Sequence, residues 1–193
     1  RLALTDWLET RLSADFYVPA GVLDAESIAS EAWVRAAHRR VLAETSFASR
    51  TMTVIGIDVD APDFGPENVI DGAPDAFMDW TAGDDEIERV FANEQLRYLA
   101  GIEVGDSIVL ETELGARSFE VLGFFHDYGN VNYSLHLPSH RFNKLYPSAK
   151  PQGWGLWIKD DEQEAAELGL SQLGLKPTQW VSQRDVLALS LAI

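Results

Sequence analysis

The chain of 193 residues contains no cysteine, few basic residues and no long apolar run. The lack of cysteine excludes disulfides and thiolate metal sites, and is compatible with a reducing or an oxidising compartment. Only 15 Lys and Arg stand against 31 Asp and Glu, a formal net charge of −16. Nucleic acids and anionic membranes are bound through clustered cations, so this balance excludes both. No segment approaches the roughly 18 apolar residues of a membrane span, so we expect a soluble piece of chain.

Two families of catalytic motif are also missing from the sequence. There is no Gly-x-Ser-x-Gly elbow for a serine nucleophile and no phosphate-binding loop ending in Gly-Lys-Ser/Thr. Any ATPase activity must therefore reside elsewhere. The chain is rich in apolar side chains, since 46% of its residues are hydrophobic. That is enough for a sizeable core in one domain or two small ones.

The most informative stretch, Val90–Asn130, begins with a predicted short helix over residues 93–100. Asn93 is a good N-cap, Gly101 suits the left-handed position after the last turn, and Leu96, Tyr98 and Leu99 give an apolar side.

A hairpin is predicted to follow, after a turn at Gly105-Asp106. Residues 107–113 alternate, with Ile108 and Leu110 on one side, and residues 117–125 alternate again around a reversal at Gly115. The inward positions of the second strand are Phe119, Val121 and Phe125.

This stretch resembles the extracytoplasmic (periplasmic) domain of FtsX-like, or MacB-like, ABC transporter permeases. Residues 6–18 resemble the segment that leaves that family's membrane helix, and residues 180–193 the segment that returns to it. Residues 59–89 match nothing in the family pattern. The resemblance is carried by Asn93, Glu94, Leu96, Gly105, Asp106, Phe119, Val121 and Gly123.

The resemblance implies a fold of the α+β class, like the MacB periplasmic core. We expect residues 1–58 plus 152–193 to form a membrane-proximal α/β subdomain of βαβ type, with residues 59–151 inserted as a mainly-β subdomain. Candidate strands are 14–18, 41–47, 52–59, 153–158 and 178–181, and candidate helices are 24–34 and 160–170, the latter capped by Asp160 or Asp161.

The resemblance also implies a non-catalytic role without cofactor or metal, on the periplasmic or extracellular side of an inner-membrane protein. The domain would couple the cycle of a cytoplasmic ATPase to export or extraction of a lipid, lipoprotein, peptide or hydrophobic substrate; some family members instead regulate cell-wall hydrolases. Its partners would be the transmembrane helices of the same permease, the ATPase subunit, a periplasmic partner or the cargo, and a second copy in a dimer.

The two ends of the chain support an excised loop domain. Leu4, Trp7, Leu8 and Leu12 predict an N-terminal helix, and Ser182 is a candidate N-cap for a helix running to Ile193. If both helices continue into membrane spans, the two termini must lie on the same face.

Two alternative classes remain open: a free-standing small-molecule-binding module, and a metal-dependent hydrolase using His126 and Asp127. His136 and His140 are four residues apart, as two ligands on a helix would be, but Pro138 makes a continuous helix there unfavourable. The acidic span from Asp58 to Glu88 is typical of a solvated surface. The alternative interpretation is a calcium site at Asp58, Asp60 and Asp63.

A partner surface is predicted around Trp154 and Trp157. Three positions apart on a strand, they point to opposite faces, so one should be more exposed than a core tryptophan. Exposed aromatic residues often anchor interfaces, so both are candidate partner-binding residues.

Overall fold

The structure, a computed structural model, describes residues 13–21, 23–62, 64–72, 75–82, 86–127 and 130–192. These divide into two compact units. Unit 1 takes the described parts of residues 1–40, 61–63 and 151–193, and unit 2 those of 41–60 and 64–150. The helix predicted at the N-terminus lies outside the described residues. Within the described ranges, no helix has the length and hydropathy of a membrane span.

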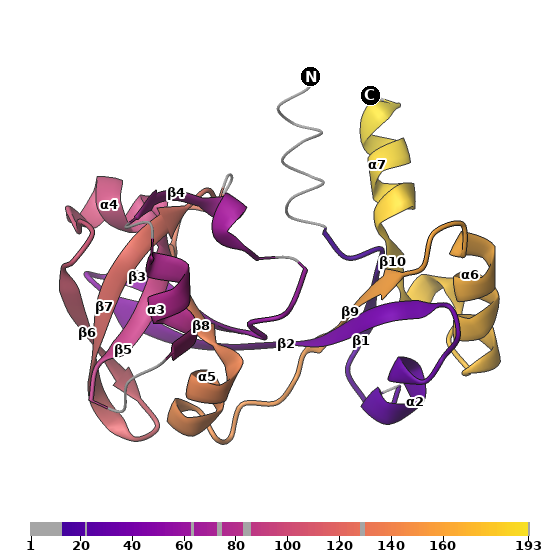
Figure 1. The fold of residues 1–193 in the computed structure, drawn as a ribbon, viewed down its shortest axis with the longest axis horizontal. Helices are drawn as coiled ribbons and strands as arrows, with labels where there is room; N and C mark the ends of the chain where they lie inside the picture. The colour runs from indigo at the N-terminus through magenta and orange to yellow at the C-terminus, as the bar shows by residue number, and fades with distance from the viewer. Residues whose placement is uncertain are drawn as a thin grey trace. The chain divides into compact units, whose positions relative to one another are not determined.

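Unit 1 is a four-stranded sheet in which helices connect strands along the chain (Figure 1). The strand order is β10-β1-β9-β2, and every neighbouring pair is antiparallel. Consequently β1 and β2 run parallel with β9 between them, and β9 and β10 run parallel with β1 between them. Each pair is joined through a helix, which makes two interlocked split βαβ units, a ferredoxin-like arrangement. Its elements are β1 (Phe16–Pro19), α2 (Ala25–Ala29), β2 (Val34–Phe47, first half), β9 (Gly153–Ile158), α6 (Gln163–Gln172), β10 (Val181–Ser182) and α7 (Gln183–Leu191).

The core of unit 1 forms because alternate residues of the strands face the helices. Phe16 and Leu156 are directly opposite in the register of β1 and β9, and both are fully buried. Ala166 and Leu170, one turn apart on α6, cover them in the same cluster. The unit is thus held by apolar packing between sheet and helix.

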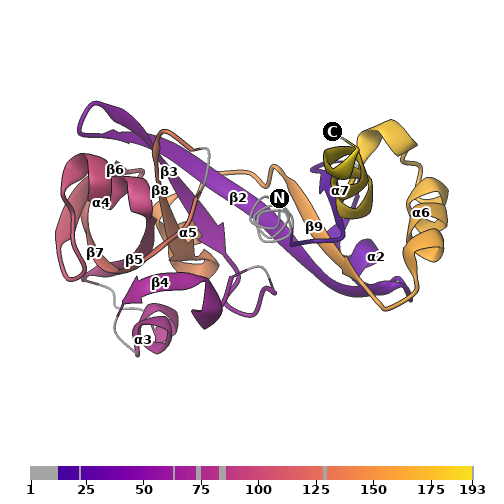
Figure 2. The same cartoon turned by 90° about the horizontal axis from the view of Figure 1, so that it is seen from above.

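Unit 2 is a mixed sheet that curls around its own core (Figure 2). From the second half of β2 the order is β3-β8-β5-β7; β3 pairs with β8, and β5 with β7, in parallel. On its other edge, β7 pairs with β6 along the first half of β7 and with β4 near the end of β7. The elements are β3 (Arg50–Ile57), β4 (Val69–Gly72), α3 (Ala76–Ala82), β5 (Glu88–Asn93), α4 (Glu94–Ala100), β6 (Ser107–Thr112), β7 (Gly115–Phe125), β8 (Tyr133–Pro138) and α5 (Ser139–Leu145).

The predicted short helix and hairpin are present in unit 2. Gly101 ends α4 with φ +70°, in the left-handed region, and β6 pairs antiparallel with β7, from Ser107 opposite Glu120 to Thr112 opposite Gly115. Ile108, Leu110 and Phe119 are buried in the unit's main cluster. The expected apolar side of α4 is wrong in part, since only Leu96 is buried while Tyr98 and Leu99 are 74% and 52% exposed.

Other boundaries differ because tertiary pairing overrides local pattern. Residues 41–58, expected in the first subdomain, lie in unit 2, since this part of β2 pairs with β3 and β3 pairs with β8. The helix expected over 24–34 ends at Ala29, because β2 begins at Val34 in order to pair with β9. The helix of residues 163–172 is preceded by Glu162 rather than capped by Asp160 or Asp161. The unassigned span 59–89 supplies β4, α3 and the start of β5.

Candidate functional site

Trp154 and Trp157 lie on opposite faces of β9 in unit 1. Trp154 is half-buried and packs at the edge of the unit's cluster around Leu156. Trp157 is only 4% exposed; its ring meets the His38 ring edge-on, with centroids 5.5 Å apart, and covers Gly155. Of the two predicted partner-binding residues, Trp154 keeps part of its side chain exposed, and Trp157 is almost fully covered.

His126 and Asp127 each contact other side chains of unit 2. The exposed His126 ring lies with Nδ1 2.9 Å from Oε2 of Glu94, the first residue of α4. The Asp127 carboxylate accepts hydrogen bonds from Ser134 Oγ at 3.1 Å and Asn130 Nδ2 at 2.7 Å. These contacts tie Asn130 and Ser134 to Asp127.

Asn93 completes this network and is fully buried. Its side chain does not cap α4; Nδ2 donates to the Asn132 carbonyl at 2.9 Å and to Asp127 at 3.3 Å. A second side chain, Gln95, donates to the Asp127 carbonyl at 3.0 Å. The family-like Asn-Glu sequence therefore ties the start of α4 to the loop that follows β7.

The surroundings of His136 differ from those of His126 and His140, because the His136 ring lies among aromatic side chains. Its ring stacks on Phe125 at 3.9 Å between centroids and meets Phe64 edge-on at 4.6 Å. Nδ1 is closed off from solvent and has no hydrogen-bond partner among the described residues. Desolvation lowers the His136 pKa to about 3, against the opposing effect of the Asp127 charge. A neutral ring stacked in this aromatic surrounding is a packing residue.

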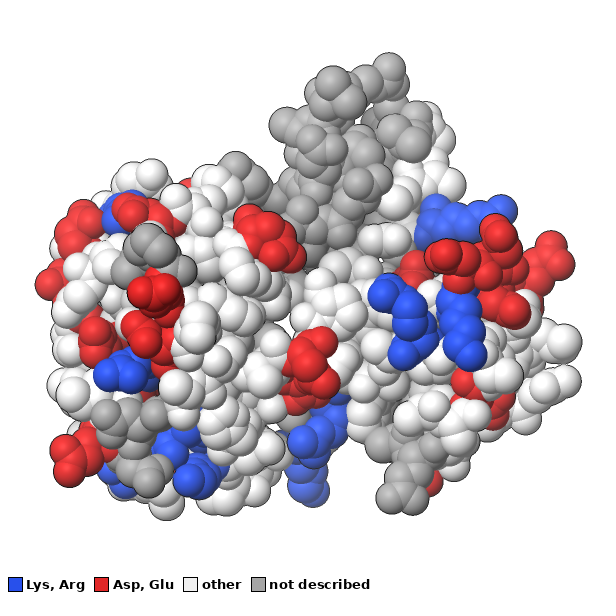
Figure 3. Space-filling model, in the orientation of Figure 1, with Lys and Arg blue, Asp and Glu red and all other residues white. Residues whose placement is uncertain are grey.

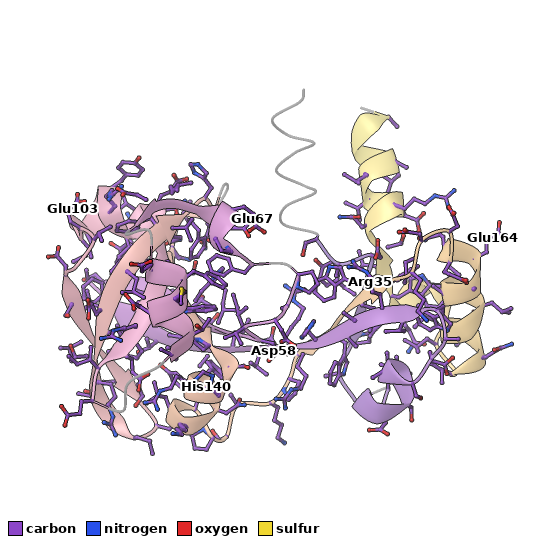
Figure 4. The ribbon with its side chains drawn as sticks, in the orientation of Figure 1. Arg35, Asp58, Glu67, Glu103, His140 and Glu164 are labelled. Atoms are coloured by element: carbon purple, nitrogen blue, oxygen red, sulfur yellow. The ribbon has the colours of Figure 1, made fainter. Side chains whose placement is uncertain are left out.

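A metal centre has no ligand set in the part of the chain that the structure describes. There, no three His, Asp or Glu side chains are close enough to hold an ion. Asp63 of the calcium alternative lies outside the described residues, and Asp58 accepts a hydrogen bond from Ser139 Oγ at 2.5 Å, at the start of α5 near His140 (Figure 4). The Asp58 carboxylate thus has a structural partner.

Two arginines whose ion pairs the local pattern did not indicate organise unit 2. Glu88, at the start of β5, receives two hydrogen bonds from the Arg141 guanidinium on α5, one of them from Nε at 2.9 Å, and both side chains are buried. Arg97 on α4 contacts Asp71 at 2.6 Å and Glu103 at 3.0 Å and lies over the Phe124 ring. The hydrogen bond to Asp71 and the nearby Glu103 charge raise the pKa of Arg97, although burial opposes them.

The surface of the chain is acidic without forming one patch on the face drawn in Figure 3, where acidic side chains are spread over each unit among uncharged ones. One shallow groove of about 510 Å³ lies in unit 2, between β2, the end of β6 and the segment after α5. Three glutamates, Glu44, Glu111 and Glu113, line it.

Comparison with known proteins gives matches at the level of structure alone. No family model and no curated protein sequence matches the chain. The structure is similar to the periplasmic region of MacB from Actinobacillus actinomycetemcomitans, with a TM-score of 0.55 and 17% identity over 92% of this chain and 91% of that one. It is also similar to the extracellular domain of the noncanonical ABC-type transporter YknZ from Gram-positive bacteria, with a TM-score of 0.51 and 14% identity over 88% of this chain and 98% of that one. The expected fold is confirmed: the chain has the α+β fold of the extracytoplasmic domains of MacB- and YknZ-type ABC transporters.

Proposed function

We propose that the chain is the extracytoplasmic domain of an ABC transporter permease and performs no chemistry of its own. The observation that carries this proposal is the extent of the structural likeness, which spans nearly the whole of this chain and nearly the whole of each matched domain. A fold can host several functions, so the proposal also draws on the family-like residues around α4 and the hairpin. Asn93 and Glu94 have defined structural roles there.

In this proposal the domain transmits movement rather than binding a cofactor. The cycle of a cytoplasmic ATPase changes the angle of the permease's membrane helices, and α7 passes that change to unit 1, the membrane-proximal part. Rigid-body movement of packed units is an established way to couple distant sites. The sheet-and-helix core of unit 1 suits it, because close-packed interiors transmit displacement instead of absorbing it.

The partners follow from the same proposal. They are the transmembrane helices of the same permease, an ATPase subunit on the cytoplasmic side of the inner membrane, and a second copy of the permease in a dimer. The cargo or periplasmic partner belongs to the lipid, lipoprotein, peptide or hydrophobic class. Trp154 is the residue of unit 1 that we assign to partner contact, because it is an incompletely covered tryptophan at the edge of an ordered cluster.

The experiment that tests the role is reconstitution of the parent permease with its ATPase in liposomes. Replacing residues 13–192 by a flexible linker should leave basal ATP hydrolysis in place and abolish transport. Transport that continues without the domain would contradict the proposal.

A point variant tests the assigned surface. Trp154→Ala should lower the coupled activity several-fold with the domain still folded, whereas Tyr98→Ala, which removes a 74% exposed aromatic ring on α4, serves as the matched control and should leave the activity unchanged. Equal activity of Trp154→Ala and the parent would remove Trp154 from the partner surface.

A further inference from the structure

The groove of unit 2 is bordered by an unpaired strand edge. Residues 41–47 of β2 pair with β3 along one edge, and the described residues supply no strand for the other. Four consecutive residues, Leu42 to Thr45, line the groove. Since alternate side chains of a strand point to opposite faces, a run of consecutive residues means that the backbone edge itself borders the groove.

The opposite border also carries unused backbone groups. β6 pairs only with β7 in the described part of the chain, and its end, at Glu111 and Thr112, lines the groove with Glu113. The Glu113 amide donates to the Leu145 carbonyl at 3.2 Å, which anchors this border to the end of α5. Two strand edges therefore bound one groove, the arrangement in which an added strand finds hydrogen-bond partners.

Tyr146 forms a packed border of the same groove. Tyr146 lines the groove and is 6% exposed, and its hydroxyl has no hydrogen-bond partner among the described residues. Burial and the nearby Glu113 charge raise the Tyr146 pKa to about 12, so the hydroxyl keeps its proton. The hydroxyl is closed off from solvent, so Tyr146 contributes packing to the groove and not a hydrogen bond.

The charges of the groove select the ligand. Glu44, Glu111 and Glu113 line it, and no Lys or Arg does. Glu113 already accepts hydrogen bonds from the Ser148 amide, at 3.1 Å, and from the Ser148 hydroxyl. Glu44 and Glu111 are exposed, and each can pair with an incoming cation. A second copy of this edge would place Glu44 against like charge, which disfavours self-pairing.

We propose that this groove binds an extended, Lys- or Arg-bearing segment of a protein partner, which adds as a strand to the edge of β2. The backbone edges supply affinity, and the glutamates choose cationic over acidic segments. The inference concerns unit 2 alone and does not rest on the proposed transporter role.

The test uses the full 193-residue chain and a fluorescent synthetic heptapeptide of alternating lysine and valine. We expect saturable binding that weakens with added salt, and backbone amide shifts in NMR at Leu42–Thr45. Glu44→Gln and Glu111→Gln should each weaken binding by about two- to fivefold. Tyr146→Phe removes a hydroxyl that is closed off from the groove, so this variant should bind as the parent does. Glu164→Gln, on an exposed residue of α6 in unit 1, should bind as the parent does (Figure 4).

Two matched peptides separate strand addition from simple charge attraction. A peptide with glutamate in place of lysine should not bind, and one with the same lysines but N-methylated valines should bind at least tenfold more weakly, because it cannot complete the ladder. The proposal is overturned by equal binding of the N-methylated peptide, by unchanged binding in both glutamate variants, or by no binding of the lysine peptide at all.

Discussion

At the scale of single residues, His136 makes the stability of unit 2 depend on pH. The folded chain keeps the ring neutral, with its pKa lowered to about 3, whereas an unfolded histidine titrates near its ordinary value of 6.5. Below that value the unfolded state takes up the proton and the folded state does not, so acid favours unfolding.

We therefore expect the free energy of unfolding to fall as the pH drops from about 7 to about 5, by at most about 1.4 kcal/mol per pH unit. Because the His136 side chain is partly exposed, the slope should be smaller than that limit. Urea titrations at a series of pH values measure it. His136→Gln should flatten the slope relative to the parent, and His140→Gln, on an exposed residue, should not. An unchanged slope in His136→Gln would refute the assignment.

The buried pair of Glu88 and Arg141 gives a second prediction at this scale. Arg141→Met leaves a carboxylate buried without its partner and should lower the free energy of unfolding by about 3–5 kcal/mol. Arg89→Met is the matched control, since Arg89 faces Glu120 at 3.8 Å with both side chains about one-third exposed, and should cost less than about 1 kcal/mol.

Adding Glu88→Leu to Arg141→Met removes the stranded charge and should recover part of the loss. Thermal or urea unfolding of the three variants decides this. A double variant less stable than Arg141→Met would show that the pair contributes more than mutual neutralisation.

At the scale of elements, Gly123 determines whether β4 can lie against β7. A Cβ at this position would stand 2.4 Å from the Asp71 carbonyl oxygen, and the residue opposite in the register is Gly72. The glycine of the family-like Phe-x-Val-x-Gly strand is therefore needed for close approach of two backbones.

Gly123→Ala should push β4 away, with faster hydrogen exchange of the β4 amides and a loss of about 1–3 kcal/mol in the free energy of unfolding. Ser118→Ala, on the same strand, is expected to leave β4 protected. Parent-like exchange of β4 in Gly123→Ala would contradict this reading.

Elements with local signals could be predicted from the sequence, and elements made by distant pairing could not. Gly101 and the alternation from Ile108 to Phe125 were enough to predict the end of α4 and the β6–β7 hairpin, whereas the Asn93 side chain does not make the predicted cap. The parallel pairs β3–β8 and β5–β7 join residues far apart in the chain, and such pairing produces no periodic pattern in the sequence. The local pattern of residues 41–58 therefore does not show that they belong to unit 2.

The same limit applies to the candidate site. Alternation placed Trp154 and Trp157 on opposite faces, but which ring is covered depends on His38, which reaches Trp157 from β2. The bond of Arg141 to Glu88 spans 53 positions, and the groove is assembled from three separate segments. Neither leaves a trace in any short stretch of sequence.

At the scale of the whole molecule, the central claim is that this chain lies outside the cytoplasm as part of an ABC permease. These 193 residues contain no cysteine, so once any cysteine elsewhere in the parent permease has been replaced, a single introduced thiol reports one position. Glu164→Cys in unit 1 and Asn143→Cys in unit 2 both replace exposed residues.

The decisive measurement is labelling of these two variants of the parent protein with a membrane-impermeant maleimide, in intact cells or, where an outer membrane is present, in spheroplasts. A cysteine in the cytoplasmic ATPase, which must stay unlabelled, checks that the membrane is closed. The account predicts labelling at both positions before lysis. Labelling of both positions only after lysis would place the domain in the cytoplasm and contradict it.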